Sequence, residues 1–225
     1  MITGKTTDGR ACPEARTLRG ALRLFLRFSS PRVLALLLGG WLAARFWAGP
    51  LGWGDVLVVA GIAAYWPWQE WALHVGLLHF RPRTILGVRV DPFAARTHRY
   101  HHRNPWILEG VFLPVSVPLL LTPVQAALWW WAMPTTALAL TGAAALTGAA
   151  LLYEWTHFIS HVPYQPRSAY VKTIRRNHQM HHFKNERYWH AFTVPAIDRF
   201  MGTGPDPATV EKSETVRTLG IDERA

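Results

Sequence analysis

The sequence has a single cysteine among its 225 residues. Cys12 cannot form an internal disulfide, and its place in a short stretch with Gly, Thr, Asp and Pro predicts a mobile tail rather than a site. Acidic residues are also scarce, with 14 Asp and Glu against 24 Lys and Arg, which gives a formal net charge of +10. Nucleic-acid-binding proteins and membrane proteins both carry such an excess, so the positions of the charges must separate the two classes.

Patterns typical of DNA-binding proteins are missing. The sequence contains no recognisable zinc finger, helix-turn-helix or basic-zipper pattern, and nucleic acid is therefore not expected as a partner. It also lacks an uninterrupted run of about 20 apolar residues, because charged residues intrude near the ends of its apolar stretches. Its composition nevertheless excludes a disordered chain, since 50% of the residues are hydrophobic and 12 are Trp.

The apolar stretches predict four membrane crossings. They cover residues 33–48, 56–80, 107–121 and 124–160, and the last has an early break at Pro134. On this arrangement seven Lys and Arg precede the first span, six lie between the second and third, and ten follow the fourth. Only Arg45 lies on the opposite side. This distribution follows the positive-inside rule and predicts a multi-pass integral membrane protein with both termini in the cytoplasm.

The arginines between residues 16 and 27 recur at steps of three, four and four, with leucines between them. This spacing predicts a basic amphipathic helix. Such a helix either lies at the membrane surface or packs on the cytoplasmic part of the protein, and the pattern does not choose between the two.

Ten of the eleven histidines form two similar sets, each a spaced pair followed by an H-x-x-H-H box. The first set is His74, His79, His98, His101 and His102, and the second is His157, His161, His178, His181 and His182. In a helix, the i, i+3, i+4 spacing of the box places its three imidazoles on one face, where they can converge on neighbouring metals. His157 and His161 also share a face. His74 and His79 would lie about 140° apart on a regular helix, which predicts a local break there or ligation from two sides.

Each pair ends an apolar stretch and each box lies in the basic segment that follows, so all ten imidazoles are expected on the cytoplasmic side. A single histidine is more often an ordinary core or surface residue, but ten unpaired imidazoles at a membrane face would be costly. Ten nitrogen ligands are too many for one tetrahedral zinc and suit two ions of five or six coordination. Iron is favoured, with zinc as an ion that the same ligands accept, because two ferrous ions can share the reduction of dioxygen.

Around these histidines the sequence resembles the fatty acid hydroxylase superfamily, and most closely the fatty acid 2-hydroxylases. The resemblance covers about residues 66–203. It rests on Glu70 to His74 with His79, the box His98 to His102 followed by Pro105, Tyr153 to His157 with His161, Asn177 to Phe183, and the ending Asp198-Arg199-Phe200-Met201-Gly202-Thr203. It implies an all-α integral membrane fold of four transmembrane helices, with a cytoplasmic helical cap that holds a histidine-rich di-metal site. It also implies that the ten histidines are the ligands and that an acyl chain is hydroxylated with dioxygen and two electrons.

The expected domain organisation is a disordered N-terminal tail at 1–14, a hydroxylase-like membrane domain at 15–203 and a C-terminal tail at 204–225. Eukaryotic members of the superfamily often carry a fused cytochrome b5 domain, but this sequence has no haem-binding His-Pro-Gly-Gly stretch. It has no G-x-G-x-x-G fingerprint and no Cys-rich cluster motif either. The electrons are therefore expected from a separate donor of the cytochrome b5 or ferredoxin type.

Two acidic residues stand just before the histidine pairs. Glu70 lies four residues before His74, and Glu154 lies three residues before His157. Each is predicted to accept a ring N–H from a ligand histidine and so to fix its tautomer, as carboxylates around metal sites do. The alternative for both is a helix-end charge that reaches polar solvent. His190 matches no ligand of the superfamily and is expected behind the ligands or at the surface.

The leading functional prediction is a monooxygenase that hydroxylates a C–H bond of a membrane lipid, with a fatty acyl chain as the substrate. The segment 104–113 departs from the superfamily in its acidic positions, which leaves the substrate open. A carotenoid or sterol hydroxylase or desaturase of the same superfamily is therefore the alternative. A membrane metal transporter is less favoured, because transporters place their ligands near the bilayer midplane, whereas these histidines lie at the ends of the spans and beyond.

Overall fold

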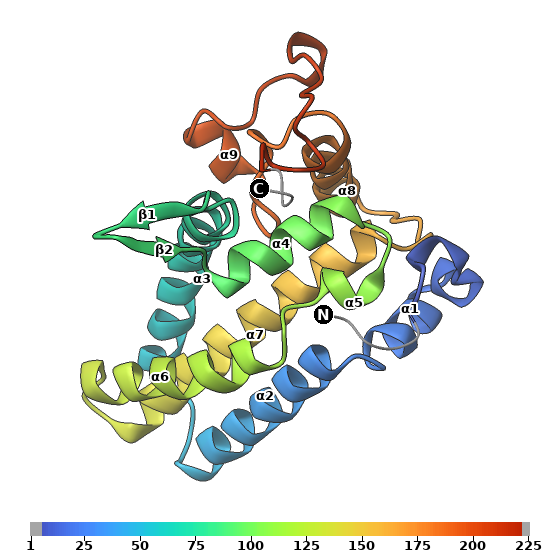
Figure 1. Cartoon of the computed structure of the whole chain (residues 1–225). Helices are drawn as coiled ribbons and strands as arrows, with labels where there is room; N and C mark the ends of the chain where they lie inside the picture. The colour runs from blue at the N-terminus through green and yellow to red at the C-terminus, as the bar shows by residue number, and fades with distance from the viewer. Residues whose placement is uncertain (1–5, 222–225) are drawn as a thin grey trace. The chain divides into compact units, whose positions relative to one another are not determined.

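A computed structural model describes residues 6–221, and these residues are mostly helical, as predicted (Figure 1). The chain divides into two compact units. Unit 1 comprises Met1–Ala21, Pro67–Val111 and Thr156–Ala225, and unit 2 comprises Leu22–Trp66 and Phe112–Trp155. Each unit gathers segments that are far apart in the sequence.

Unit 2 contains long apolar helices. They are α2 (Ser29–Trp47), most of α3 (Trp53–Leu73), α6 (Ser116–Ala132) and most of α7 (Thr136–Ser160). Among the described residues, two helical segments are long and apolar enough to cross a membrane by length and composition: Leu108–Ala132, which includes α5 (Leu108–Val111) and α6, and Thr136–Ser160.

The division between the third and fourth apolar stretches differs from the prediction. The sequence pattern ends the third stretch at residue 121, but α6 continues through Pro123 to Ala132. A proline inside a membrane helix is tolerated where neighbouring groups satisfy the freed backbone carbonyl. The chain turns instead at Met133, whose backbone is extended (φ −95°, ψ 140°) before Pro134, as expected for a residue that precedes proline.

Small residues allow close packing within unit 2. A Cβ atom added to Gly142 of α7 would lie 2.7 Å from the ring of Trp129 in α6, so no larger residue fits there. A Cβ atom on Gly54 of α3 would lie 3.0 Å from the side chain of Leu138 in α7. Such contacts are typical of membrane helices, in which small residues let neighbouring backbones approach.

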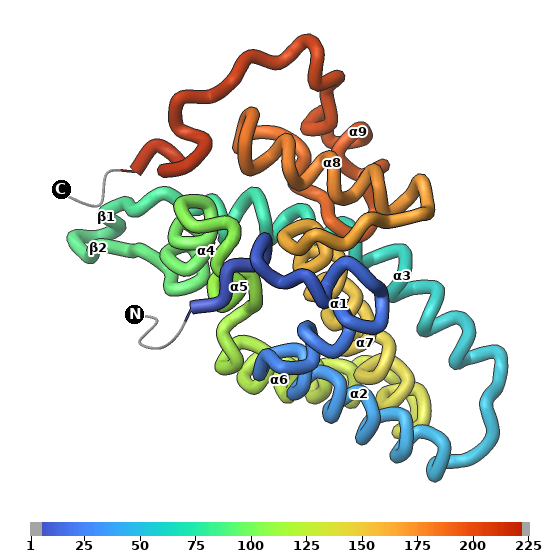
Figure 2. Tube along the Cα trace, turned by 90° about the vertical axis from the view of Figure 1, so that its right-hand side faces the viewer, coloured from blue at the N-terminus to red at the C-terminus, as the bar shows by residue number. Residues whose placement is uncertain are grey.

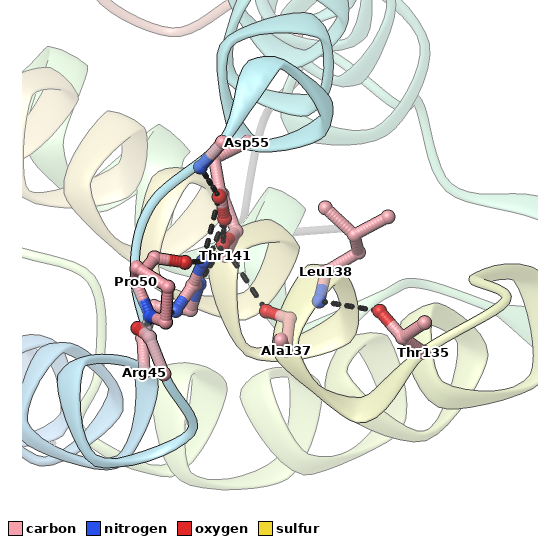
Figure 3. Close-up of polar contacts among 9 residues, drawn as sticks. Arg45, Pro50, Asp55, Thr135, Ala137, Leu138 and Thr141 are labelled. Atoms are coloured by element: carbon pink, nitrogen blue, oxygen red, sulfur yellow. Dashed lines mark hydrogen bonds and ion pairs between the residues drawn. The ribbon is translucent and has the colours of Figure 1, made fainter.

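A buried ion pair links α2, α3 and α7 (Figure 3). Arg45 at the end of α2 contacts Asp55 at the start of α3 through two bonds of 2.6 and 2.7 Å, and Nε of Arg45 also donates to Thr141 of α7 at 2.9 Å. The other guanidinium nitrogens donate to the carbonyl oxygens of Gly49 and Pro50. Arg45 is only 4% exposed, so this cation depends on its partners for stability.

Unit 1 is built from shorter helices and one hairpin (Figure 2). These elements are α4 (Phe93–Arg103), α5 (Leu108–Val111), α8 (Ala169–Phe183), α9 (Ala196–Phe200), β1 (Arg83–Ile85) and β2 (Val88–Val90). The two strands are antiparallel, and Thr84 pairs with Arg89. The short helix α1 (Leu18–Phe25) confirms the helix predicted from the arginine spacing, over fewer residues.

The described parts of both predicted tails are ordered. Residues 1–5 lie outside the described residues, but Thr7 donates from its backbone N–H and its hydroxyl to Glu109, and Cys12 is buried. Near the other end, the hydroxyl of Thr215 donates to Glu186 at 2.6 Å. Composition does not reveal long-range hydrogen bonds of this kind.

Candidate metal centre

All ten histidines of the two sequence sets lie in unit 1, and they form two groups. Group A contains His74, His79, His98, His102 and His181, and group B contains His101, His157, His161, His178 and His182. In each group, one ring nitrogen from every residue lies within 4.8 Å of the corresponding nitrogens of the others. Nine of the ten side chains belong to buried residues, and His79 is half-buried.

A π-helical turn at His74–Leu78 brings the first pair together. Its N–H groups bond five residues back, and the N–H of His79 donates to the carbonyl of His74 at 3.1 Å. The widened turn compensates for the five-residue spacing, so the two rings lie 4.9 Å apart between their centroids. This feature confirms the local break that the spacing predicts. The second pair needs no such turn, because His157 lies in the last turn of α7 and His161 follows the end of that helix directly, so the two rings lie 5.0 Å apart between their centroids.

The middle histidine of each box belongs to the opposite group. In α4, His98 and His102 belong to group A and His101 belongs to group B. In α8, His178 and His182 belong to group B and His181 belongs to group A. Helical geometry explains this, because residues i and i+4 lie about 40° apart around the axis whereas i+3 lies about 60° away on the other flank. Each box therefore contributes to both groups and ties them to one pair of helices.

The distances between nitrogens fit metal coordination. In group A, the Nε2 atom of His98 lies 3.1 Å from that of His74 and 3.2 Å from that of His102. In group B the Nε2 atoms of His101 and His157 are 3.0 Å apart. Two imidazole nitrogens bound about 2.1 Å from one ion at a right angle would lie about 3.0 Å apart. The groups thus have the spacing of adjacent positions around a five- or six-coordinate ion.

One histidine in each group contacts all four others. The ring of His79 lies 4.9 to 5.2 Å from the other rings of group A, whereas those of His98 and His181 are 6.5 Å apart. The ring of His161 takes the same place in group B, where its neighbours lie 4.7 to 5.3 Å away. The second histidine of each sequence pair thus occupies the same place in its group.

Backbone carbonyls orient the outer nitrogens of group A. Nδ1 of His74 lies 2.6 Å from the carbonyl oxygen of His190, and Nδ1 of His181 lies 2.7 Å from that of Tyr188. Nδ1 of His102 lies 3.0 Å from the carbonyl oxygen of Val216. An acceptor at Nδ1 places the ring proton there and leaves Nε2 free as a metal ligand.

Two buried carboxylates hold the segment that carries two of these carbonyls. Asp198 accepts the N–H groups of His190 and Ala191, each at 2.9 Å. Glu70 accepts those of Phe192 and Thr193, at 2.5 and 2.9 Å. Four consecutive N–H groups therefore bond to two side chains from α3 and α9, while the carbonyl of His190 on the same segment faces His74.

The two acidic residues that precede the histidine pairs make different contacts. Glu70 accepts the N–H groups of Phe192 and Thr193, and the carbonyl of His190, two residues before Phe192, lies at Nδ1 of His74. Glu154 accepts from the hydroxyl of Ser30 at 2.9 Å and from the N–H of Leu113 at 3.0 Å, both within unit 2. The sequence spacing could not reveal the backbone acceptors, because a carbonyl that orients a histidine has no side-chain pattern.

Burial favours the neutral form of these imidazoles. It lowers the pKa of His74, His98, His178 and His181 well below the ordinary value of 6.5, and neighbouring imidazoles lower it further. Burial also lowers the pKa of His102 to about 4. A histidine must be neutral to bind a metal, so the site holds its side chains in the ligand form.

The remaining histidine lies against group A. His190 is 4% exposed, and its ring centroid is 5.1 Å from those of His74 and His181. Burial lowers its pKa to about 4. It therefore lies behind the group, one of the two positions expected from the sequence. The neighbouring ring of Phe192 contacts both groups, with centroids 5.1 Å from His74 and 4.9 Å from His157.

Comparisons with known proteins identify the family of the chain. The family model for fatty acid hydroxylase matches residues 58–203. Two dihydroceramide fatty acyl 2-hydroxylases from Arabidopsis thaliana are 29% identical over 150 residues and 28% identical over 159 residues. These matches cover 66% and 70% of this chain but 61% and 64% of the two relatives, so the chain spans less than two thirds of their length.

A solved structure has a similar fold. The structure described as full-length Scs7p, in which only the hydroxylase domain is visible, superposes with a TM-score of 0.62 at 20% identity. The superposition covers 89% of this chain and 72% of that one. Because the family model matches more than half of the sequence and includes all ten grouped histidines, the chain belongs to the fatty acid hydroxylase family.

Proposed function

We propose that this protein is a di-iron monooxygenase that hydroxylates a fatty acyl chain of a membrane lipid, at the carbon next to the carbonyl. One C–H bond becomes C–OH, and dioxygen, two electrons and two protons supply the oxygen atom and release one water. The observation that carries the proposal is the pair of buried five-histidine groups. The acyl substrate and the position follow from the names of the Arabidopsis relatives.

Group A and group B would each hold one iron ion. Five neutral nitrogen donors exceed the four ligands of a structural zinc site and suit iron, which accepts imidazole at five or six coordination. Two ferrous ions in such a site supply the capacity to reduce dioxygen with electrons from outside. Zinc fits the same nitrogens and is the ion that could replace iron on purification, but it cannot change its redox state.

The chain's own residues provide the order of the site. The carbonyls of Tyr188, His190 and Val216 fix the tautomers of three ligands before any ion binds. Asp198 and Glu70 hold the segment that carries the His190 carbonyl. Burial of the rings excludes water from the surroundings of the reacting C–H bond, which limits loss of oxidising equivalents to solvent.

The membrane topology is part of the proposal. We assign the four spans to α2, α3, α6 and α7, which have 19, 21, 17 and 25 residues. At 1.5 Å per residue these helices measure about 26 to 38 Å, close to the thickness of about 30 Å of a bilayer core. Leu36 of α2, Leu57 of α3 and Leu120 of α6 are 77, 71 and 69% exposed, as expected of side chains that face lipid.

This topology places the termini and both histidine groups in the cytoplasm, together with nearly all the basic residues. The single arginine on the opposite side, Arg45, is neutralised by Asp55. The lipid substrate would then enter the site of the two histidine groups from the membrane. The proposed source of the electrons is a separate cytoplasmic donor of the cytochrome b5 or ferredoxin type.

Lipid mass spectrometry tests the proposal. Extracts of a host that expresses the protein should contain acyl chains heavier by about sixteen mass units, the mass of one inserted oxygen atom. His181→Ala should abolish the product, whereas Gln179→Ala on the same helix should retain it. Fragment ions should place the hydroxyl next to the carbonyl. Oxidised carotenoid or sterol instead of hydroxylated acyl chains would replace the proposed substrate, and unchanged product in His181→Ala would refute the site.

A further inference from the structure

The hairpin β1–β2 exposes an apolar tip. The two strands are joined by Leu86 and Gly87, and both faces of the hairpin are exposed over most of their length. Ile85 and Val88, which pair across the strands, are 45% and 65% exposed, and Leu86 is 99% exposed. Figure 1 and Figure 2 both show the hairpin projecting outward beside α4. An isolated two-stranded hairpin is marginally stable in water, so a covering surface would stabilise it.

The residue at the tip is unfavourable for the turn that it forms. Leu86 and Gly87 both have positive φ, at 48° and 79°, as in the two-residue turn that favours Asn-Gly. A leucine in the left-handed region is strained, and a fully exposed leucine gains nothing from the protein itself. Strain of this kind usually accompanies a function of the side chain. An apolar side chain at the end of a projecting hairpin suits a partner that buries it.

Cations lie along the base of the hairpin. Arg81, Arg83, Arg89 and Arg96 are exposed at the hairpin and at the start of α4. The only acidic residue between Arg81 and Arg96 is Asp91, and it is engaged by Arg99 at 2.7 Å. The guanidinium of Arg83 lies over the ring of Phe80, 4.4 Å from its centroid. The hairpin therefore combines an apolar end with an excess of positive charge along its base.

We propose that this hairpin is a membrane-surface anchor, in which Ile85, Leu86 and Val88 enter the headgroup region and the arginines bind anionic phospholipid headgroups. The inference rests on the proposed membrane location, because β1 begins ten residues after α3 ends. Apolar side chains flanked by Lys or Arg are the pattern by which segments bind at a bilayer interface. The hairpin also begins four residues after His79, so its contact with lipid would fix one group of histidines relative to the membrane surface.

Site-specific fluorescence tests the anchor. A Cys12→Ala background leaves no native thiol, so Leu86→Cys can be labelled with an environment-sensitive dye and reconstituted into phosphatidylcholine–phosphatidylglycerol nanodiscs. Spin-labelled lipid should reduce the emission about twofold, as expected for a side chain at the headgroup and acyl boundary. The same label on Lys212→Cys, an exposed position near the C-terminus, should be insensitive to the lipid. A water-like, unquenched signal at position 86, or equal quenching at both positions, would overturn the anchor.

A second variant separates lipid contact from folding. Leu86→Asn favours the turn, since Asn tolerates positive φ, but removes the apolar tip. In nanodiscs, trypsin should cleave at Arg83 and Arg89 about tenfold faster than in the wild type, because burial of one leucine contributes more than 1.4 kcal/mol, a factor of ten. Equal or slower cleavage contradicts the proposal. Lipid quenching in a protein that makes no hydroxylated lipid would refute the proposed function but leave the anchor intact.

Discussion

Replacing Asp198 with Asn should weaken metal binding at group A and leave group B nearly unchanged. The carboxylate accepts the N–H groups of His190 and Ala191 with different oxygens, each at 2.9 Å. An amide keeps one acceptor and turns the other into a donor, so one buried N–H loses its partner. Asp198 is 0% exposed, and water cannot replace the lost bond without a rearrangement of the segment.

The expected loss of metal affinity follows from these hydrogen bonds. A buried donor without an acceptor costs about 1 to 3 kcal/mol. This cost falls on the segment at His190, whose carbonyl oxygen lies 2.6 Å from Nδ1 of His74. Part of it should therefore appear as a displacement of the His74 ring. Changes in groups that orient ligands typically reduce metal affinity about 10- to 100-fold. We expect a loss within that range at group A.

Chelator competition with the metal-loaded protein measures this loss. The wild type should release its two ions over one range of chelator concentration, and Asp198→Asn should release one ion at a concentration about 10- to 100-fold lower. Asp206→Asn is the control, because that exposed carboxylate only accepts the N–H of Ala208. Equal loss of both ions, or unchanged release, would refute the idea that Asp198 acts on His74 through the carbonyl group of His190.

Three other outcomes are expected. His101→Ala should lower the ion content of group B and His181→Ala that of group A, although the other two histidines of each box belong to the opposite group. Elemental analysis combined with chelator release checks this. Loss of the group A ion in His101→Ala, or of the group B ion in His181→Ala, would contradict the assignment of these two residues. Asp55→Ala should destabilise the folded protein in detergent by about 3 to 5 kcal/mol, because it leaves Arg45 buried without its anion, whereas the double variant Arg45→Met with Asp55→Leu should recover much of the loss. Metal-free protein should lose stability as the pH falls below 6.5. Burial lowers the pKa of imidazoles such as His102 to about 4, so the folded state keeps them neutral while the unfolded chain binds protons. One such group contributes about 2 kcal/mol between pH 7 and 5, so a thermal midpoint that is constant over this range would contradict it.

The sequence was sufficient to identify the ten histidines that form the two groups and to predict a mostly helical fold, because both follow from periodic patterns. The spacing of the boxes places three imidazoles on one face of a helix, and the five-residue interval from His74 to His79 predicts a break that appears as a π-helical turn. The fold class is equally direct, since apolar stretches separated by basic segments favour helices. Family resemblance and pattern therefore pointed to the same residues.

The rest depended on contacts between distant segments. The placement of His101 and His181 in the groups opposite to their box neighbours follows only when the two helices are placed face to face. The position of residue i+3, about 60° from residue i around the helix axis, is consistent with it. The carbonyls of Tyr188, His190 and Val216 have no distinguishing side chain, so no sequence pattern identifies them. The contact of Thr7 is of the same kind, because its partner Glu109 lies more than 100 positions away in the sequence.

The proposed di-iron centre is tested most directly by the iron content of protein reconstituted with ferrous iron under anaerobic conditions, combined with X-ray absorption spectroscopy of the metal. We expect about two iron ions per chain, each with about five imidazole nitrogens at about 2.1 to 2.2 Å, by analogy with other metal–imidazole bonds. One ion or fewer per chain, or a coordination shell dominated by oxygen, would contradict the assignment of the two five-histidine groups as a di-iron centre.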